Sequence, residues 1–91
     1  LSWAAALFSQ LQRAALSVPL NIAEGWTFSR SKTCTRHLTI AYGSAVEVGE
    51  LLHLARDLSV VPHGRVTALI ERNLQSRRLL VGLLKSRRPM S

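Results

Sequence analysis

The residues of this sequence best suited to chemistry are its arginines and lysines. The chain has ten arginines and two lysines but only five Asp and Glu residues, which gives a formal net charge of +7. Arginine presents a planar fork of N–H donors to phosphate and stacks on bases, so this bias indicates contact with nucleic acid. Half of the cations lie between residues 72 and 88. The candidate nucleic-acid-binding residues are Arg72, Arg77, Arg78, Lys85, Arg87 and Arg88.

Helical phase spreads these cations around their helix rather than along one stripe. Arg77 and Arg88 flank the apolar face of the helix, whereas Arg78 and Lys85 lie on another face. The positive potential of these cations would attract phosphates, and this binding would weaken as the salt concentration rises. The alternative is a solvated terminal helix, whose cations favour the negative end of the helix dipole. The sequence leaves both interpretations open.

Two other combinations of residues are weaker candidates for chemistry. Glu50 and His53 have the Glu-x-x-His spacing of di-iron bundles, but such sites need a second motif and two further carboxylates. With five acidic residues in the chain, we expect no metal and no cofactor. Ser44 and Cys34 are potential nucleophiles, yet Ser44 faces away from His53. No nucleophile elbow or phosphate loop occurs, so we expect no catalytic residue and no enzyme activity.

Three amphipathic helices must position these residues. The first is expected from Trp3 to Glu24, since its apolar residues recur at spacings of three and four. Pro19 predicts a kink, because it removes a backbone donor and crowds the carbonyl of Ala15. Gly25 is well placed to end the helix in a left-handed conformation.

The second helix is expected from about Lys32 to Leu58, with Ser31 or Thr33 as its N-cap. Glycine is costly inside a helix, so Gly43 and Gly49 suggest a close helix approach. The third helix begins at Pro62 or Arg65 and ends at Arg87, before Pro89. The pattern predicts an all-α, up-and-down antiparallel bundle that forms one domain, residues 1–91.

Composition limits the class of protein further. Hydrophobic residues are 47% of the chain and charged residues 19%, which is rich for a solvated monomer of 91 residues. We therefore expect a homo-oligomer. No apolar run approaches the roughly 18 residues of a membrane span. Cys34 is the only cysteine, so a reducing compartment is the default and we expect a cytoplasmic protein.

Two ordered motifs connect the chain to a known family. Residues 10–25 read Q-x-x-R-A-A-x-S-hydrophobic-P-x-N-I-A-E-G, and residues 40–47 read I-A-x-G-S-x-x-E. The chain resembles the four-helix-bundle proteins encoded within intervening sequences of bacterial 23S ribosomal RNA genes. The motif residues are Arg13, Pro19, Asn21, Glu24, Gly25, Gly43, Ser44 and Glu47.

This resemblance implies a bundle that assembles into a ring, often a pentamer. It also implies kinship with the accessory proteins of diversity-generating retroelements, which bind a reverse transcriptase and nucleic acid. RNA, DNA and a reverse transcriptase-like protein are therefore the partners that it suggests. The family's first helix would lie before Trp3, and without it an apolar groove would be open to a partner helix.

The motif residues at the end of the first helix allow two interpretations. Asn21, Glu24 and Gly25 could form a functional corner, or they could hold a helix end together with Arg13 or Arg30 as partner. We favour the structural interpretation, because one carboxylate without a paired base supports little chemistry. For the whole chain, three hypotheses remain: a basic nucleic-acid scaffold, a protein-interaction module with an apolar groove, and a protein of the membrane surface.

Overall fold

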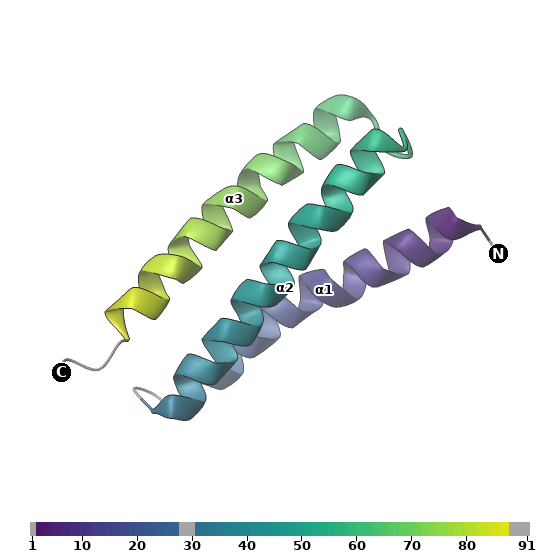
Figure 1. Ribbon diagram of the computed structural model, residues 1–91. Helices are drawn as coiled ribbons and strands as arrows, with labels where there is room; N and C mark the ends of the chain where they lie inside the picture. The colour runs from purple at the N-terminus through teal and green to yellow at the C-terminus, as the bar shows by residue number, and fades with distance from the viewer. Residues whose placement is uncertain (1, 28–30, 88–91) are drawn as a thin grey trace.

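The computed structural model describes residues 2–27 and 31–87. Three helices run antiparallel and up-and-down: α1 (Trp3–Thr27), α2 (Lys32–Asp57) and α3 (His63–Ser86) (Figure 1). No strand occurs in these residues. The predicted fold class is confirmed, and each predicted helix is found with its ends within three residues of the expected ones.

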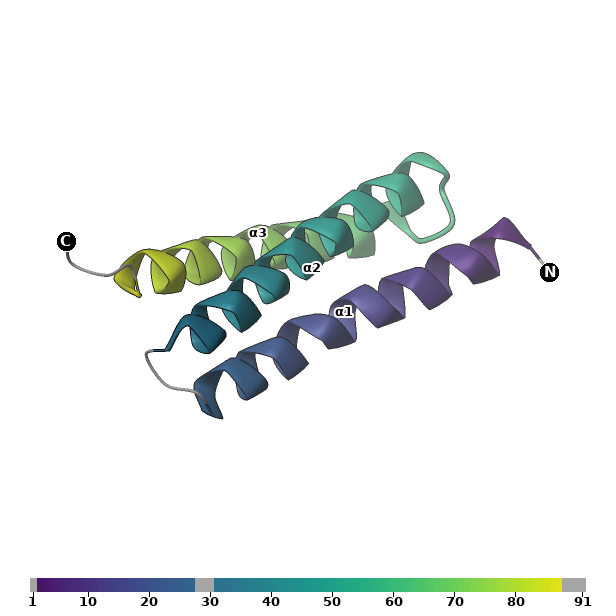
Figure 2. The same cartoon turned by 60° about the horizontal axis from the view of Figure 1, so that its bottom comes forward.

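The helices form one layer with α2 in the middle. The backbone of α2 packs against both α1 and α3, whereas the backbones of α1 and α3 do not approach each other (Figure 2). The molecule is accordingly flat, with extents of 48 × 25 × 16 Å.

Small side chains on α2 let both neighbouring helices come close. Ala41, Ala45, Gly49 and Ala55 are buried along one face of α2. Larger apolar residues complete two core clusters. One cluster holds Cys34, Leu38 and Leu80, and the other holds Leu52, Val66 and Ile70.

Local hydrogen bonds define both ends of α2. The hydroxyl of Ser31 accepts from the backbone N–H of Cys34 at 3.2 Å, so Ser31 is the N-cap. At the other end, the N–H of Ser59 donates to Arg56 and that of Val60 to Ala55. Ser59 has φ of 55°, which makes this end a Schellman motif with serine in the left-handed position.

The expected end of the first helix was wrong. The helix continues past Glu24 to Thr27, and no described glycine has a positive φ. Gly25 is buried against α2 inside the helix, so its missing side chain serves helix packing rather than a left-handed cap. Pro19 lies within α1, which runs through it as one helix.

The prediction of close approach at two glycines of α2 is half correct. A Cβ on Gly49 would lie 2.7 Å from Oδ1 of Asn73, so α3 does come close there. A Cβ on Gly43 would meet nothing within 4 Å, because this residue faces away from the neighbouring helices. Among the described residues, no helix is both long and apolar enough to cross a membrane.

Candidate nucleic-acid interface

The antiparallel arrangement sorts the charges along the bundle. The hydrogen bonds of Ser17 with Ser44 and of Asn73 with Ala45 mark one level of the bundle. On one side of this level, the start of α2 lies beside the second half of α3. We call the six described cations of this region the basic end: Lys32, Arg36, Arg77, Arg78, Lys85 and Arg87. Glu24 is the one carboxylate among the described residues of this half.

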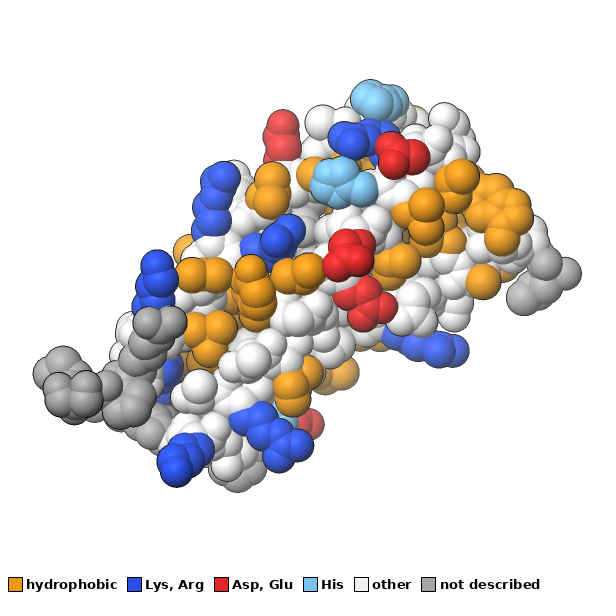
Figure 3. Space-filling model, in the orientation of Figure 1, with side chains coloured by type: hydrophobic (Ala, Val, Ile, Leu, Met, Phe, Trp, Pro, Cys, Tyr) orange, Lys and Arg blue, Asp and Glu red, His pale blue; other side chains and the backbone are white. Residues whose placement is uncertain are grey.

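The other half of the bundle is balanced in charge. Its described residues include four cations and four carboxylates: Arg13, Arg56, Arg65, Arg72, Glu47, Glu50, Asp57 and Glu71. Figure 3 shows acidic side chains gathered over the upper half of the molecule, whereas blue side chains predominate toward its lower left. The net positive charge of the described residues therefore lies at one end.

A hollow within the basic end combines cations with an aromatic ring. Tyr42 of α2 and Arg77 and Arg78 of α3 line it together with two apolar residues of α3, and its volume is about 260 Å³. Arg78 is exposed and Arg77 half-buried. Proteins that bind single-stranded nucleic acid combine such cations, which contact the phosphates, with aromatic rings, on which the bases stack.

Arg87 lies over a second aromatic residue of this end. Its guanidinium carbon is 4.7 Å from the centre of the Trp26 ring, which joins the end of α3 to the end of α1. Its Nη1 is buried and has no hydrogen-bond partner within the described part of the chain. The cation–π contact therefore holds this side chain, and Trp26 stays exposed beside it.

The structure brings together some of the six predicted cations and separates others. Arg77 and Arg78 share the hollow, and Lys85 is exposed in the last turn of α3. Arg72 lines a different surface, the groove between α1 and α3. Arg88 lies outside the described residues.

Four residues of the candidate interface were not predicted from the sequence: Lys32, Arg36, Tyr42 and Trp26. Lys32 and Arg36 come directly after the first loop, about 40 residues before Arg77, so charge clustering along the chain could not reveal them. Two short loops make the three helices antiparallel, and this topology alone would have placed residues 32–36 near the end of α3.

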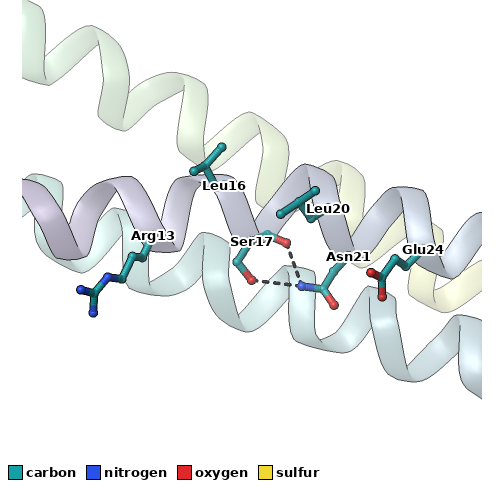
Figure 4. A pocket seen from close by; sticks show the side chains of 6 residues that line it. All are labelled: Arg13, Leu16, Ser17, Leu20, Asn21 and Glu24. Carbon is teal, nitrogen blue, oxygen red and sulfur yellow. Dashed lines mark hydrogen bonds between the residues drawn. The ribbon is translucent and has the colours of Figure 1, made fainter.

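Polar residues of the two family motifs form, together with His37, a polar seam between α1 and α2. The hydroxyl oxygens of Ser17 and Ser44 are 2.7 Å apart. Nδ2 of Asn21 donates to the carbonyl oxygen and to Oγ of Ser17 at 2.8 and 3.0 Å (Figure 4). This fixes Oδ1 of Asn21 towards His37, whose Nδ1 donates to it at 3.0 Å. Oε2 of Glu24 lies 3.7 Å from the same nitrogen.

The seam shows which side chains the motif residues at the end of the first helix contact. The structural interpretation describes their contacts, but the partner of Asn21 and Glu24 is His37 rather than Arg13. Arg30, the other predicted partner, lies outside the described residues. Further along the seam, Nε2 of Gln10 donates to Oε2 of Glu47 at 2.6 Å.

An apolar groove runs over α2 between α1 and α3. Its volume is about 410 Å³, and its floor and walls come from all three helices. The apolar residues that line it are Leu11, Ala15, Val18, Pro19, Ala45, Val48, Leu52 and Leu69. The separation of α1 from α3 leaves this groove open to solvent.

The structure also places the candidates for metal binding and nucleophilic chemistry. Nδ1 of His53 donates to the carbonyl of Gly49 at 2.8 Å, and Asp57 lies 3.9 Å from Arg56. The described residues contain no group of three or more His, Cys, Asp or Glu side chains placed to hold a metal ion. The side chain of Cys34 is fully buried.

These features define a small all-α protein with a polar seam, a basic end and an open groove. The sequence profile of the 23S rRNA-intervening sequence protein family matches residues 4–82. The match covers most of the chain, and the protein belongs to this family. No curated protein and no solved structure matches it.

Proposed function

We propose that this protein is a non-enzymatic scaffold that binds nucleic acid through its basic end. The observation that supports the proposal is the separation of charge, with six described cations and one carboxylate in one half of the bundle. A nucleic acid gains free energy by releasing counterions where cations concentrate, and a charge-balanced surface offers little of this gain.

The hollow at the basic end favours single-stranded over fully paired nucleic acid. Tyr42 can stack on an unpaired base while Arg77 and Arg78 contact the phosphates beside it. The family resemblance implies kinship with retroelement accessory proteins, which supports nucleic acid as the ligand and adds a reverse transcriptase-like protein as a partner. Assembly of several copies, as the resemblance suggests, would multiply the basic ends.

The single buried thiol suits a reducing compartment such as the cytoplasm.

Fluorescence anisotropy tests the proposal. Labelled single-stranded RNA and duplex DNA are titrated with the protein at several salt concentrations from about 50 to about 200 mM. We expect tighter binding to the single strand, with an affinity that falls linearly in a plot of log K against log salt. Absence of binding at the lowest salt would contradict a nucleic-acid role.

The open groove supports a second candidate function, as a module that binds a partner helix. An amphipathic helix would bury the apolar lining, and an acidic residue on it would meet Arg72 at the α3 wall. An environment-sensitive apolar dye should bind the free protein, and Val48→Gln should weaken this binding. A protein that binds no dye would rule the candidate out.

A further inference from the structure

Trp26 and Arg87 continue the two walls of the apolar groove into the basic end. On α1, Trp26 follows the groove residue Pro19 by about two helical turns. On α3, Arg87 follows the groove residue Leu69 by about five turns. Whole numbers of turns keep a residue on the same side of its helix. The contact between Trp26 and Arg87 therefore lies on the groove side of the bundle.

The hollow at the basic end lies on the other side of α3. Arg78, which lines the hollow, comes about two and a half turns before Arg87, so the two side chains leave α3 in opposite directions. Lys85 follows Arg78 by about two turns and is exposed on the hollow side. The basic end thus presents one aromatic ring on each side: Tyr42 in the hollow and Trp26 beyond the groove.

The ring of Trp26 is held on one face and accessible elsewhere. The guanidinium of Arg87 lies over one face, with Cζ 4.7 Å from the ring centre. Trp26 is nevertheless 53% exposed. An exposed aromatic face binds an unpaired base by stacking, whatever the identity of the base. The guanidinium on the covered face fixes the orientation of the ring and adds positive charge beside it.

We propose that Trp26 is a second platform on which an unpaired base of the bound nucleic acid stacks. The inference rests on the proposed nucleic-acid function, and it adds a site on the groove side to the hollow that contains Tyr42. A strand that reaches both rings passes over the last turn of α3, where Lys85 contacts its phosphates. A duplex keeps its bases stacked inside and offers none to the ring, so this platform selects single strands.

Tryptophan fluorescence tests the platform directly, because the two tryptophans of the chain lie at opposite ends of the bundle (Figure 1). Trp3 begins α1 in the balanced half and is 58% exposed, which makes it a matched control. Trp3→Phe leaves Trp26 as the only reporter, and Trp26→Phe leaves Trp3. We expect a single-stranded oligothymidylate of about 12 nucleotides to quench most of the emission of Trp26 and little of that of Trp3.

Anisotropy of a labelled copy of the same strand distinguishes the failure of this inference from the failure of the proposed function. Binding without quenching of Trp26, or with equal quenching of Trp3 and Trp26, would overturn the platform and leave the proposed function standing. Absence of binding at low salt would overturn the proposed function, and the platform with it.

An abasic strand of the same length separates stacking from charge. It keeps the sugar–phosphate backbone and lacks the bases, so it should still bind the basic end through its phosphates. At saturation we expect it to quench Trp26 at least about threefold less than oligothymidylate does. Equal quenching by the two strands would show that phosphates and not bases approach the indole, and would overturn the platform.

Substitution of Trp26 tests its contribution to affinity. Trp26→Ala should weaken binding by at least about fivefold without changing the slope of log K against log salt, because stacking releases no counterions. Trp26→Phe keeps a ring and should recover part of the loss, and Trp3→Ala should cost less than about twofold. Circular dichroism checks that each variant keeps its helices. A salt slope reduced as much by Trp26→Ala as by Arg87→Gln would show that Trp26 only holds Arg87, and would overturn the proposal.

Discussion

Gly25 of α1 lies directly against His37 of α2. A Cβ on Gly25 would be 3.1 Å from Cβ of His37 and 3.3 Å from the carbonyl oxygen of Cys34. Neither neighbour is the free end of a flexible side chain, so neither can easily move away. In this same turn of α2, His37 is hydrogen-bonded to Asn21. The absence of a side chain at Gly25 thus sets how closely the polar seam can close.

Replacing Gly25 with valine should therefore destabilise the protein. We expect Gly25→Val to lower the free energy of unfolding by about 2 kcal/mol, because the added methyl groups overpack the contact between α1 and α2. Urea unfolding followed by circular dichroism measures this change. An unchanged midpoint would show that the seam is looser than the distances indicate.

Gly43 is a glycine at which a larger side chain is expected to have the opposite effect. It lies inside α2 with nothing within 4 Å of an added Cβ. Gly43→Ala should raise the free energy of unfolding by about 0.5–1 kcal/mol, since alanine is the better helix former and meets no neighbour. Loss of stability here would mean that Gly43 is covered by something in solution, such as another copy of the chain.

The hydroxyl pair of Ser17 and Ser44 should couple α1 to α2. A double-mutant cycle with Ser17→Ala, Ser44→Ala and the double variant measures the interaction free energy. We expect a coupling of about 0.5–1.5 kcal/mol, as for a partly buried neutral hydrogen bond. Additive effects of the two substitutions would show that the hydroxyls contribute separately.

Ser59 occupies the left-handed position that ends α2, with φ of 55°. A side chain in this conformation costs about 1 kcal/mol, and glycine has no such cost. Ser59→Gly should therefore raise the thermal midpoint. Ser9→Gly, at an exposed serine inside α1, should lower it, because glycine weakens a helix interior. If both substitutions act in the same direction, the left-handed cap is not formed in solution.

The sequence predicted the helices because their buried residues repeat every three to four positions. Leu38, Ala41 and Ala45 on α2, and Val66 and Ile70 on α3, recur at this spacing and are buried. The end of α1 was not predicted, since a glycine reads as a helix end unless the surface opposite it is known. Only the packing of Gly25 against His37 distinguishes the two uses of glycine.

The candidate site was predicted only along α3. Arg77 and Arg78 were identified from local charge, but their neighbour Tyr42 comes from α2 and is apolar by pattern. Arg72 was grouped with them by sequence distance, yet it points to the groove on another side of the helix. The segregation of charge between the two halves depends on the topology of the bundle. The positions of charged residues along the sequence do not reveal it.

The most direct test of the nucleic-acid proposal compares two variants of equal net charge. One carries Arg77→Gln, Arg78→Gln and Lys85→Gln at the basic end. The other carries three substitutions in the balanced half: Arg56→Gln, Arg65→Gln and Arg72→Gln. Glutamine removes the charge and keeps a good helix former, so both variants should stay folded.

Anisotropy titrations of labelled single-stranded RNA over a salt series then separate position from total charge. We expect the basic-end variant to lose at least about tenfold in affinity and its salt slope to fall by about one for each cation removed. The balanced-half variant should bind within about threefold of the unmodified chain. Equal losses in the two variants would contradict the proposal, because binding would then follow net charge and not the basic end.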